Sequence, residues 1–298
     1  MRILVTGRHG QLARSLVERA AGRPGTTIVL AARPQLDLER PETIAPALDA
    51  VRADAIINAA AYTAVDKAED EPDRAWAINA EAPGLLARAA AARDIPIVHL
   101  SSDYVFDGSG EDARDETART GPLGVYGRSK LAGEEKVCAA APRHAIVRTA
   151  WVYSPFGTNF VKTMINAAKT RDALAVVSDQ HGNPTCALDL ADGLLRLLEQ
   201  WTSGVRDGGT YHLAGTGDAS WFELACEVFA QCRKHGLPAA DVRPIATADW
   251  PTRAVRPANS RLDSRKFERD FGFRMPDWRL SVAATVERLA RGDQDAAA

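Results

Sequence analysis

Short apolar runs alternate with longer amphipathic segments over the first half of the chain. The apolar runs are rich in β-branched residues and carry few polar positions, which is typical of strands buried on both faces of a parallel sheet. They cover residues 3–6, 27–31, 55–58, 97–101 and 145–148. Between them, apolar residues recur every three or four positions, which predicts helices at residues 11–21, 41–51, 73–93 and 125–140. The alternation predicts an α/β fold with a doubly wound parallel sheet.

The pattern becomes less regular beyond residue 150. Helical periodicity at residues 160–169 and 188–201 alternates with strand-like runs at 174–177 and 210–213. From residue 220 onward, two helical segments flank a Pro- and Arg-rich stretch, residues 243–261, which predicts an extended connector. We therefore expect a large Rossmann-type domain at residues 1–150 and a smaller C-terminal α+β lobe made mainly of residues 151–298. Segments within 170–215 should rejoin the large sheet, and residues 293–298 should fray.

Charge and hydropathy exclude several classes of partner. The chain has 298 residues and a formal net charge of −2, so we expect neither nucleic acid nor an anionic membrane surface as a partner. The apolar runs fall short of the roughly 20 residues needed to cross a bilayer. The first residues lack the pattern of a secretory signal peptide, so we expect a cytoplasmic protein.

Cysteine and histidine give no sign of a disulfide framework or a metal site. The cysteines stand in Ala- and Leu-rich stretches without a C-x-x-C pair, which predicts small core residues. They are Cys138, Cys186, Cys226 and Cys232. The six histidines are dispersed, with no pair at the spacing of helical metal ligands. We expect no metal.

A glycine-rich turn follows the first predicted strand and opens the first helix. Gly7 and Gly10 allow a tight turn and a close approach of the backbone, and unpaired N–H groups at a helix start attract an anion. Ala13 stands where a third glycine is usual. The spacing predicts a pyrophosphate site; a plain tight turn is the alternative.

The end of the second strand bears on which dinucleotide binds. It lacks the acidic residue that would accept hydrogen bonds from a free ribose 2′-hydroxyl, and Arg33 could pair with a 2′-phosphate there. This favours NADPH, with NADH as the second option. A solvated surface arginine is the alternative. Asp37 and Leu38 could pass near the adenine, although Asp37 also suits a helix cap.

Tyr126 and Lys130 are four residues apart and so share one face of a predicted helix. A tyrosine has an ordinary pKa of about 10, and a neighbouring ammonium favours the phenolate and lowers that pKa. The pair therefore indicates a proton-handling site, with help from a semi-enclosed cleft and a cationic nicotinamide ring. The same spacing can also arise by chance, so its context decides the interpretation.

Ser102 supplies that context. It directly follows the C-terminal end of the strand predicted at residues 97–101, and open α/β sheets bind their ligands at such ends. Its hydroxyl could hydrogen-bond a substrate carbonyl beside Tyr126. The alternative is a serine that caps a loop. Together, Ser102, Tyr126 and Lys130 predict a reductase that delivers hydride to a carbonyl carbon.

Several runs of sequence carry a resemblance to a known family. They cover residues 58–69, 101–106, 125–134, 148–153, 179–185 and 256–262. With these runs the chain resembles the extended short-chain dehydrogenases/reductases, and among them the dTDP-4-dehydrorhamnose reductases, over nearly its whole length. The resemblance implies hydride transfer from NADPH to C4 of dTDP-4-dehydro-6-deoxy-L-mannose, which gives dTDP-L-rhamnose, with Tyr126 as the proton donor.

The resemblance also implies roles for single residues. Gly10, Gln11 and Leu12 would hold the cofactor diphosphate. Ala60, Ala61, Tyr62 and Thr63 would line the ribose and nicotinamide half of the cofactor, where Lys130 would bind ribose hydroxyls. Ser102, Asp103 and Trp151 would contact the deoxysugar, although a core aromatic is the alternative for Trp151. Arg253 and Arg256 are candidates for the nucleotide diphosphate because guanidinium groups suit it; surface charges are the alternative.

The family's bridging metal does not carry over to this chain. Some relatives hold a divalent cation at a dimer interface through acidic side chains, one of them in the first helix, where this chain has Ser15. Glu18, Asp189 and Asp192 do not obviously replace it. A bridging Mg²⁺ is therefore doubtful, and monomer and homodimer both stay open.

Two alternative functions belong to related proteins. The regulatory subunit of methionine adenosyltransferase is similar over the whole chain and binds NADP without a settled reaction, but the intact Ser102, Tyr126 and Lys130 argue for catalysis. A nucleotide-sugar epimerase or a GDP-fucose synthase type of enzyme would need a retained NAD(P) or a further acid–base pair. The runs around Ser102 and Trp151 fit the rhamnose reductases better.

Overall fold

A six-stranded parallel sheet forms the centre of the larger lobe in the computed structural model, which describes residues 1–202 and 208–292. Its strands stand in the order β10-β5-β4-β3-β1-β2. Their bounds are β1 (Arg2–Thr6), β2 (Thr27–Ala31), β3 (Ala55–Asn58), β4 (Ile97–Ser102), β5 (His144–Thr149) and β10 (Gly209–His212). The strand order reverses between β1 and β3, which is where open α/β sheets bind ligands. The prediction of a doubly wound α/β fold is confirmed.

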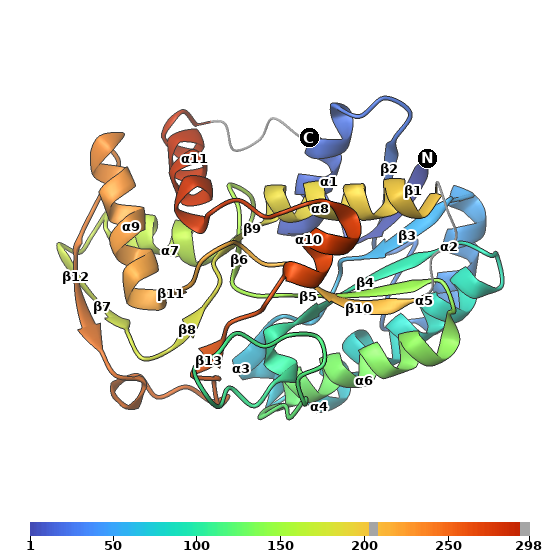
Figure 1. The fold of residues 1–298 in the computed structure, drawn as a ribbon, viewed down its shortest axis with the longest axis horizontal. Coiled ribbons are helices and arrows are strands. Elements are labelled where there is room, and N and C mark those ends of the chain that lie inside the picture. The colour runs from blue at the N-terminus through green and yellow to red at the C-terminus, as the bar shows by residue number, and fades with distance from the viewer. Residues whose placement is uncertain (203–207, 293–298) are drawn as a thin grey trace.

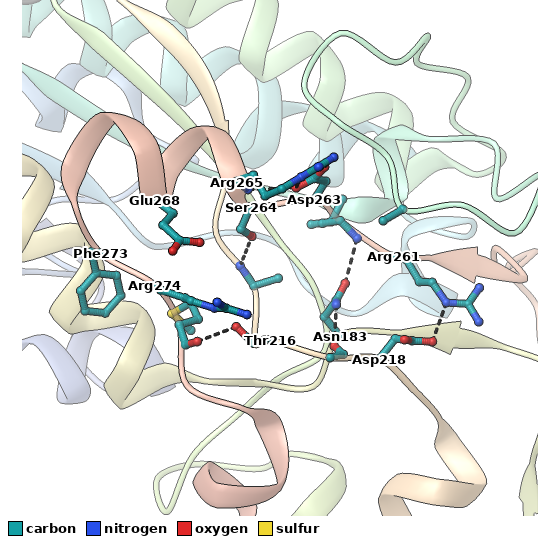
Figure 2. A pocket seen from close by; sticks show the side chains of 16 residues that line it. Asn183, Thr216, Asp218, Arg261, Asp263, Ser264, Arg265, Glu268, Phe273 and Arg274 are labelled. Atoms are coloured by element: carbon teal, nitrogen blue, oxygen red, sulfur yellow. Dashed lines mark hydrogen bonds and ion pairs between the residues drawn. The ribbon is translucent and has the colours of Figure 1, made fainter.

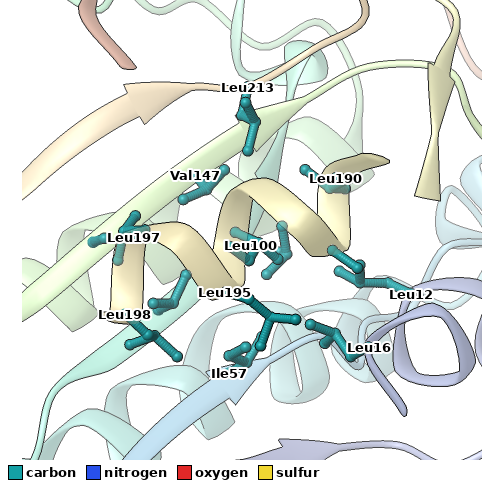
Figure 3. Packing of buried hydrophobic residues seen from close by; sticks show 14 of the residues in the cluster. Leu12, Leu16, Ile57, Leu100, Val147, Leu190, Leu195, Leu197, Leu198 and Leu213 are labelled. Atoms are coloured by element: carbon teal, nitrogen blue, oxygen red, sulfur yellow. The ribbon is translucent and has the colours of Figure 1, made fainter. Parts of the chain in front are cut away.

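Helices cover both faces of this sheet (Figure 1). On one face lie α1 (Gln11–Ala21) and α8 (Ala187–Thr202); on the other lie α2 (Ile44–Val51), α5 (Ala82–Ala91) and α6 (Val125–Ala140). Side chains alternate along each strand, so Ile3 and Val5 pack toward α1 and α8 while Leu4 packs toward α2 and α5. Figure 3 shows leucines of α8 closing over Ile57, Leu100 and Val147. The central strands β1, β3, β4 and β5 are therefore largely buried on both sides, whereas the edge strand β2 is only partly buried.

The helix predicted at residues 73–93 is interrupted. The structure has α4 (Pro72–Trp76), a π-helical turn (Ala77–Glu81) and then α5, and a short helix α3 (Val65–Ala68) precedes them. A 3₁₀ turn (Pro41–Thr43) likewise precedes α2. Apolar periodicity does not distinguish these local windings from one continuous helix, whereas π turns occur often at functional sites.

The smaller lobe combines short strands with three packed helices. Figure 1 shows α7, α9 and α11 gathered at one end of the large sheet. The helices are α7 (Phe160–Ala167), α9 (Trp221–Lys234) and α11 (Trp278–Ala290), while α10 (Arg265–Phe271) packs on the core of the larger lobe. The strand pairs are β7 (Ala173–Val177) with β12 (Asp241–Ile245), β6 (Val152–Tyr153) with β9 (Thr185–Cys186), and β8 (His181–Gly182) with both β11 (Ala219–Ser220) and β13 (Asn259–Ser260). A second apolar core lies between these helices and strands.

Two expectations for the second half need correction. The connector predicted at 243–261 begins as part of β12, which pairs with β7 and carries Pro244 in its middle; a two-stranded edge tolerates proline because its free N–H side needs no partner. Two helices, α10 and α11, follow this stretch where one was predicted. Within residues 170–215, β10 joins the large sheet and α8 packs on it, while β7 pairs with β12 in the smaller lobe. The domain boundary at residue 150 stays a prediction, and the predicted frayed tail, residues 293–298, lies outside the described residues.

The cysteines divide between core and surface. Cys186 and Cys232 are buried and Cys226 is half-buried, but Cys138 on α6 is exposed. The prediction of core residues is therefore wrong for Cys138. Its neighbour Val137 faces the core, and adjacent residues on a helix point about 100° apart.

Candidate active site

A cavity of about 470 Å³ opens at the C-terminal edge of the large sheet, where the strand order reverses. Its walls come from the turn after β1, the loop after β3, the ends of β4 and β5, and the start of α6. The lining residues are Thr6, Gly7, His9, Gly10, Gln11, Leu12, Ala13, Ala59, Ala60, Ala61, Thr63, Leu100, Ser101, Tyr126, Lys130, Thr149, Val152, Gly157, Thr158 and Leu190. The structure thus brings the glycine turn and the Tyr126–Lys130 pair into one space.

The glycine turn has the geometry of an anion cradle. Gly7 has a φ of +91°, which favours glycine, and its N–H donates to Ala31 O over 2.8 Å. Gly10 is the N-cap of α1, no side chain caps this helix, and a Cβ at Gly10 would meet nothing within 4 Å. The start of α1 therefore offers unpaired backbone N–H groups and open space. These features fit the diphosphate of a dinucleotide. Ala13 is buried against the sheet, where a larger side chain would push α1 outward.

A buried hydrogen-bond chain holds the loop after β3 at the cavity. The Ala60 N–H donates to Thr6 Oγ1 over 2.9 Å, and the Thr6 hydroxyl donates to Asn58 Oδ1 over 2.7 Å. Asn58 Nδ2 in turn contacts His99 Nδ1 over 2.9 Å. Burial lowers the pKa of His99 well below its usual value, so the imidazole is neutral and can accept this bond. Ala60 is thereby fixed as part of the cavity wall.

Tyr62 is turned away from the cavity. Its hydroxyl donates to Glu71 Oε2 over 2.9 Å, and its backbone N–H donates to Asn79 Oδ1 over 2.8 Å. Asn79 lies in the π-helical turn and also donates to Ser129 Oγ on α6 over 3.1 Å. Its neighbours Ala61 and Thr63 line the cavity, as Ala60 does. Of the four residues predicted for this loop, only Tyr62 does not line the cavity.

The residues expected near the adenine lie outside this cavity. Arg33 follows β2 and is largely exposed, with Glu39 Oε2 at 4.0 Å from its guanidinium. Asp37 accepts a hydrogen bond from the Glu39 N–H, and Leu38 is buried in the core beside α2. Because Ala31 O binds the Gly7 N–H, Arg33 stands near the mouth of the turn. Its pairing with a 2′-phosphate stays a prediction.

Lys130 is buried with its ammonium aimed into the sheet edge. Lys130 Nζ donates to Leu100 O over 2.6 Å. Burial lowers the pKa of Lys130 to about 8, and the Glu134 carboxylate opposes the fall. Glu134 itself forms a buried ion pair with Arg148 at 2.6 Å. Lys130 therefore keeps its charge in the neutral range but loses it in mild alkali.

The expected lowering of the Tyr126 pKa is wrong for the protein alone. Burial raises the pKa of the Tyr126 phenol above its usual range, the Asp103 carboxylate adds to the rise, and a hydrogen bond with Ser102 opposes it. The prediction failed because desolvation and the nearby Asp103 charge dominate, while the Lys130 ammonium is engaged with Leu100 O. A neutral phenol suits a proton donor, which is the role that carbonyl reduction requires.

Ser102 and Asp103 form a buried pair next to Tyr126. The Ser102 hydroxyl donates to Asp103 Oδ1 over 2.8 Å and accepts from the Tyr104 N–H over 3.1 Å. Burial raises the pKa of Asp103 to about 6, although hydrogen bonds from Ser260 and Ser102 oppose the rise. The ring centroids of Tyr104 and Tyr126 lie 5.4 Å apart. These contacts place the predicted serine and aspartate beside the proton donor.

The two candidate arginines differ in their relation to the site. Arg256 binds Asp66 Oδ2 over 2.6 Å and Tyr104 Oη over 3.2 Å, so it lies one residue away from Tyr126. Arg253 is 65% exposed and pairs with Asp70 at 2.6 Å. The Arg256 pair joins the connector after β12 to α3 of the larger lobe, and the Arg253 pair joins it to Asp70, just beyond the end of α3. The structure brings Arg256 to the site and leaves Arg253 on the surface.

Trp151 stands between the two lobes at the end of β5. It contacts the core of the smaller lobe and a small apolar cluster around Val105 and Phe106. Its indole stacks on Trp221, with ring centroids 3.6 Å apart and planes 9° apart.

Three residues at or near the site were not predicted from the sequence: Trp221, Tyr104 and Asn79. Tyr104 stands two residues after Ser102 in the same run, but no periodicity or spacing marks the other two.

A second cavity, of about 390 Å³, lies between the loop 214–218 and the residues around 261–275 (Figure 2). Many of its polar side chains already bind one another. Arg261 pairs with Asp218 over 2.7 Å, and Asn183 Oδ1 accepts from the Leu262 N–H over 2.8 Å. It contains none of the predicted site residues. These bonds tie the connector to the smaller lobe and give no sign of catalytic chemistry.

The acidic residues considered for a bridging metal are paired with basic or hydroxyl groups. Glu18 binds Arg288 at 2.6 Å, Asp192 binds Arg19 and Arg23, each at 3.1 Å, and Asp189 accepts from Ser281. Across residues 1–202 and 208–292, no group of three His, Cys, Asp or Glu side chains is placed to hold a metal ion.

Among the helices of residues 1–202 and 208–292, none is both long and apolar enough to cross a membrane.

Known proteins resemble the chain over nearly its whole length. The family model of the RmlD substrate binding domain matches residues 1–291. The dTDP-4-dehydrorhamnose reductase of Sinorhizobium fredii is 45% identical over 99% of this chain and 100% of its own length. The crystal structure of a dTDP-4-dehydrorhamnose reductase from Clostridium acetobutylicum superposes with a TM-score of 0.90 at 37% identity, covering 97% of this chain and 99% of that one. The dTDP-4-dehydrorhamnose reductase of Bacillus anthracis, solved in complex with NADP, gives 0.88 at 34% identity, covering 95% and 98%.

Proposed function

The chain belongs to the family of the dTDP-4-dehydrorhamnose reductases, and on this premise we propose that it reduces dTDP-4-dehydro-6-deoxy-L-mannose to dTDP-L-rhamnose with NADPH. The observation that carries the proposal is one cavity that combines a glycine-rich anion cradle with Tyr126 and Lys130. Its position at the reversal of strand order is where this class of fold binds nucleotides. Family membership narrows the substrate, since the cavity alone indicates only a carbonyl reductase.

The cofactor would lie along the glycine turn and the loop after β3. Gly7, Gly10, Gln11 and Leu12 would hold its diphosphate against the start of α1. Ala60, Ala61 and Thr63 would line its ribose and nicotinamide half, with Lys130 on the ribose hydroxyls. When bound, NADPH supplies the hydride for C4 of the sugar. Arg33 is the residue that favours NADPH over NADH, because it stands near the mouth of the turn.

Tyr126 supplies the proton in this proposal. Its raised pKa keeps the phenol neutral at working pH, so it can donate to the sugar's 4-oxygen as negative charge develops there. Lys130, still largely charged below its pKa of about 8, lowers the cost of the resulting phenolate. Ser102 orients the carbonyl beside the phenol. Hydride adds to C4 and the phenol proton to O4, so the ketone becomes an alcohol.

The rest of the substrate would extend toward the smaller lobe. Asp103 and Trp151 would contact the deoxysugar, and Arg256, with Arg253 at the rim, would bind the nucleotide diphosphate. Arg256 would have to exchange Asp66 for the diphosphate, which is a trade between two charge-assisted bonds. We place this reaction in the cytoplasm and leave monomer and homodimer both open.

The test is consumption of NADPH by the purified protein with dTDP-4-dehydro-6-deoxy-L-mannose. We expect turnover by the wild type and a loss of about 10²- to 10⁴-fold in kcat for Tyr126→Phe. Wild-type turnover with NADPH but retention of most of the rate by Tyr126→Phe would overturn the assignment of the proton donor. Absence of wild-type turnover, together with capture of a synthetase partner, would favour the non-catalytic regulatory subunit.

A further inference from the structure

Trp151 is held in a backbone conformation that side chains rarely adopt. Its φ is +48°, in the left-handed region, and such a conformation persists only where the surroundings determine it. Thr149, two residues before it, and Val152, directly after it, line the cavity of the proposed active site. The Trp151 backbone is therefore part of the path that the chain takes around that cavity.

The Trp151 indole is packed from two directions. Its ring stacks on Trp221 with nearly parallel planes, at a centroid distance of 3.6 Å. Its edge lies against Gly182, where an added Cβ would come within 2.7 Å of Trp151 Cε2. Gly182 thus makes room for the indole and Trp221 holds it there. Trp151 is nevertheless only half-buried, so part of it remains open to a ligand.

Trp221 is itself rigidly mounted on the smaller lobe. It is the first residue of α9, whose start is fixed by a capping box: the Glu223 N–H donates to Ser220 Oγ over 3.1 Å, and the Ser220 N–H donates to Glu223 Oε2 over 2.7 Å. The Phe160 ring of α7 lies 4.7 Å from the Trp221 ring. A row of three aromatic rings, Phe160, Trp221 and Trp151, therefore runs from the smaller lobe to the edge of the cavity.

We propose that Trp221 is a positioning residue, which fixes the Trp151 indole as one wall of the sugar subsite and so sets the affinity for the nucleotide sugar. The proposal rests on the proposed function, because Trp151 is there assigned to the deoxysugar. An indole face suits the apolar C–H face and the methyl group of a 6-deoxyhexose. Trp221 touches neither the hydride nor the proton, so it should act on substrate binding and leave the chemical step largely unchanged.

The kinetic test compares two substitutions at Trp221. Trp221→Leu removes the stacking face, and we expect the KM for the ketosugar to rise on the order of tenfold, with kcat and the Kd for NADPH nearly unchanged. Trp221→Phe keeps a flat ring and should restore most of the affinity. Gly182→Ala displaces the indole from its other side and should raise the same KM. Trp76→Phe, at an exposed tryptophan outside the site, is the matched control and should change neither value.

A spectroscopic cycle tests the stack without substrate. Coupled indoles give a near-ultraviolet circular dichroism signal that belongs to the pair, so the differences caused by Trp151→Phe and Trp221→Phe should not add up to that of the double variant. The differences caused by Trp151→Phe and Trp76→Phe should add up. Additive spectra at 151 and 221 would overturn the stacked arrangement.

The two proposals fail in different ways. An active wild type, with an unchanged KM in Trp221→Leu, would overturn the positioning role. So would equal losses in kcat and NADPH binding, which would mean a general structural role for Trp221. A wild type that binds NADPH but does not turn over the ketosugar would instead overturn the proposed function.

Discussion

The Ser102 hydroxyl donates its hydrogen to Asp103 Oδ1 over 2.8 Å. A hydroxyl carries one hydrogen, so Ser102 cannot donate to a substrate carbonyl while the Asp103 carboxylate accepts that hydrogen. Once protonated, Asp103 can donate to Ser102, and the Ser102 hydrogen can turn toward the substrate. The protonation state of Asp103 therefore controls what Ser102 does in the site.

The pH dependence of kcat/KM should show both buried groups. Activity should decline in two steps as pH rises, near pH 6 as Asp103 ionises and Ser102 loses its free hydrogen, and near pH 8 as Lys130 loses its charge. Asp103→Asn should remove the lower step and keep the upper one. A wild-type profile that is flat from about pH 5.5 to about pH 7, a range that brackets the Asp103 pKa, would contradict this role for Asp103.

The buried Asp103 carboxylate should also lower the free energy of unfolding at neutral pH. Its pKa is about 6 in the folded protein against 3.8 in its ordinary state, so the folded form binds the proton more tightly. The difference corresponds to about 3 kcal/mol of stability, which is fully present below pH 3.8, where Asp103 is protonated in both states, and is lost as pH rises through about 6. Asp103→Asn should therefore raise the free energy of unfolding at pH 7.5, about 1.5 units above that pKa, with a gain that shrinks as pH falls toward 4. Urea unfolding at several pH values measures this, and a stability loss at every pH would contradict it.

The two glycines of the phosphate turn should separate binding from folding. A Cβ at Gly10 meets no atom within 4 Å, so Gly10→Ala should leave the free energy of unfolding within about 0.5 kcal/mol of the wild type. The methyl group would occupy the space for the diphosphate, and the Kd for NADPH should rise at least about tenfold. Gly7→Ala should destabilise the fold by about 1–2 kcal/mol because its φ is +91°. Unchanged NADPH affinity in Gly10→Ala, by fluorescence titration, would place the cofactor elsewhere.

The two arginines of the connector should contribute unequally. Arg256 contacts Tyr104 beside the site, whereas Arg253 is mostly exposed. Arg256→Met should raise the Kd for dTDP about tenfold or more, because a charge-assisted hydrogen bond is lost. Arg253→Met should raise it less than about threefold, as exposed ion pairs contribute little. Calorimetric titration of dTDP compares them, and equal effects would contradict the placement of the diphosphate at Arg256.

Local patterns predicted the parts of the site that depend on local geometry. Tyr126 and Lys130 share a face because they are four residues apart on one helix, and the glycine turn follows β1 directly. The Arg256–Asp66 pair, the Trp151–Trp221 stack and the pairing of β12 with β7 each join segments far apart along the chain. Such contacts leave no periodic signal, so the sequence could not place them. The rise in the Tyr126 pKa likewise depends on burial and on Asp103, which only the folded structure reveals.

The central claim is that the cavity carries hydride to C4 of the ketosugar while Tyr126 protonates O4. Its most direct test is a reaction with NADPH that carries deuterium in the transferable position, followed by NMR of the sugar product. The account predicts dTDP-L-rhamnose with deuterium at C4 from the wild type, and almost none from Tyr126→Phe that still binds NADPH. Deuterium at another carbon, or equal labelling by both proteins, would contradict it.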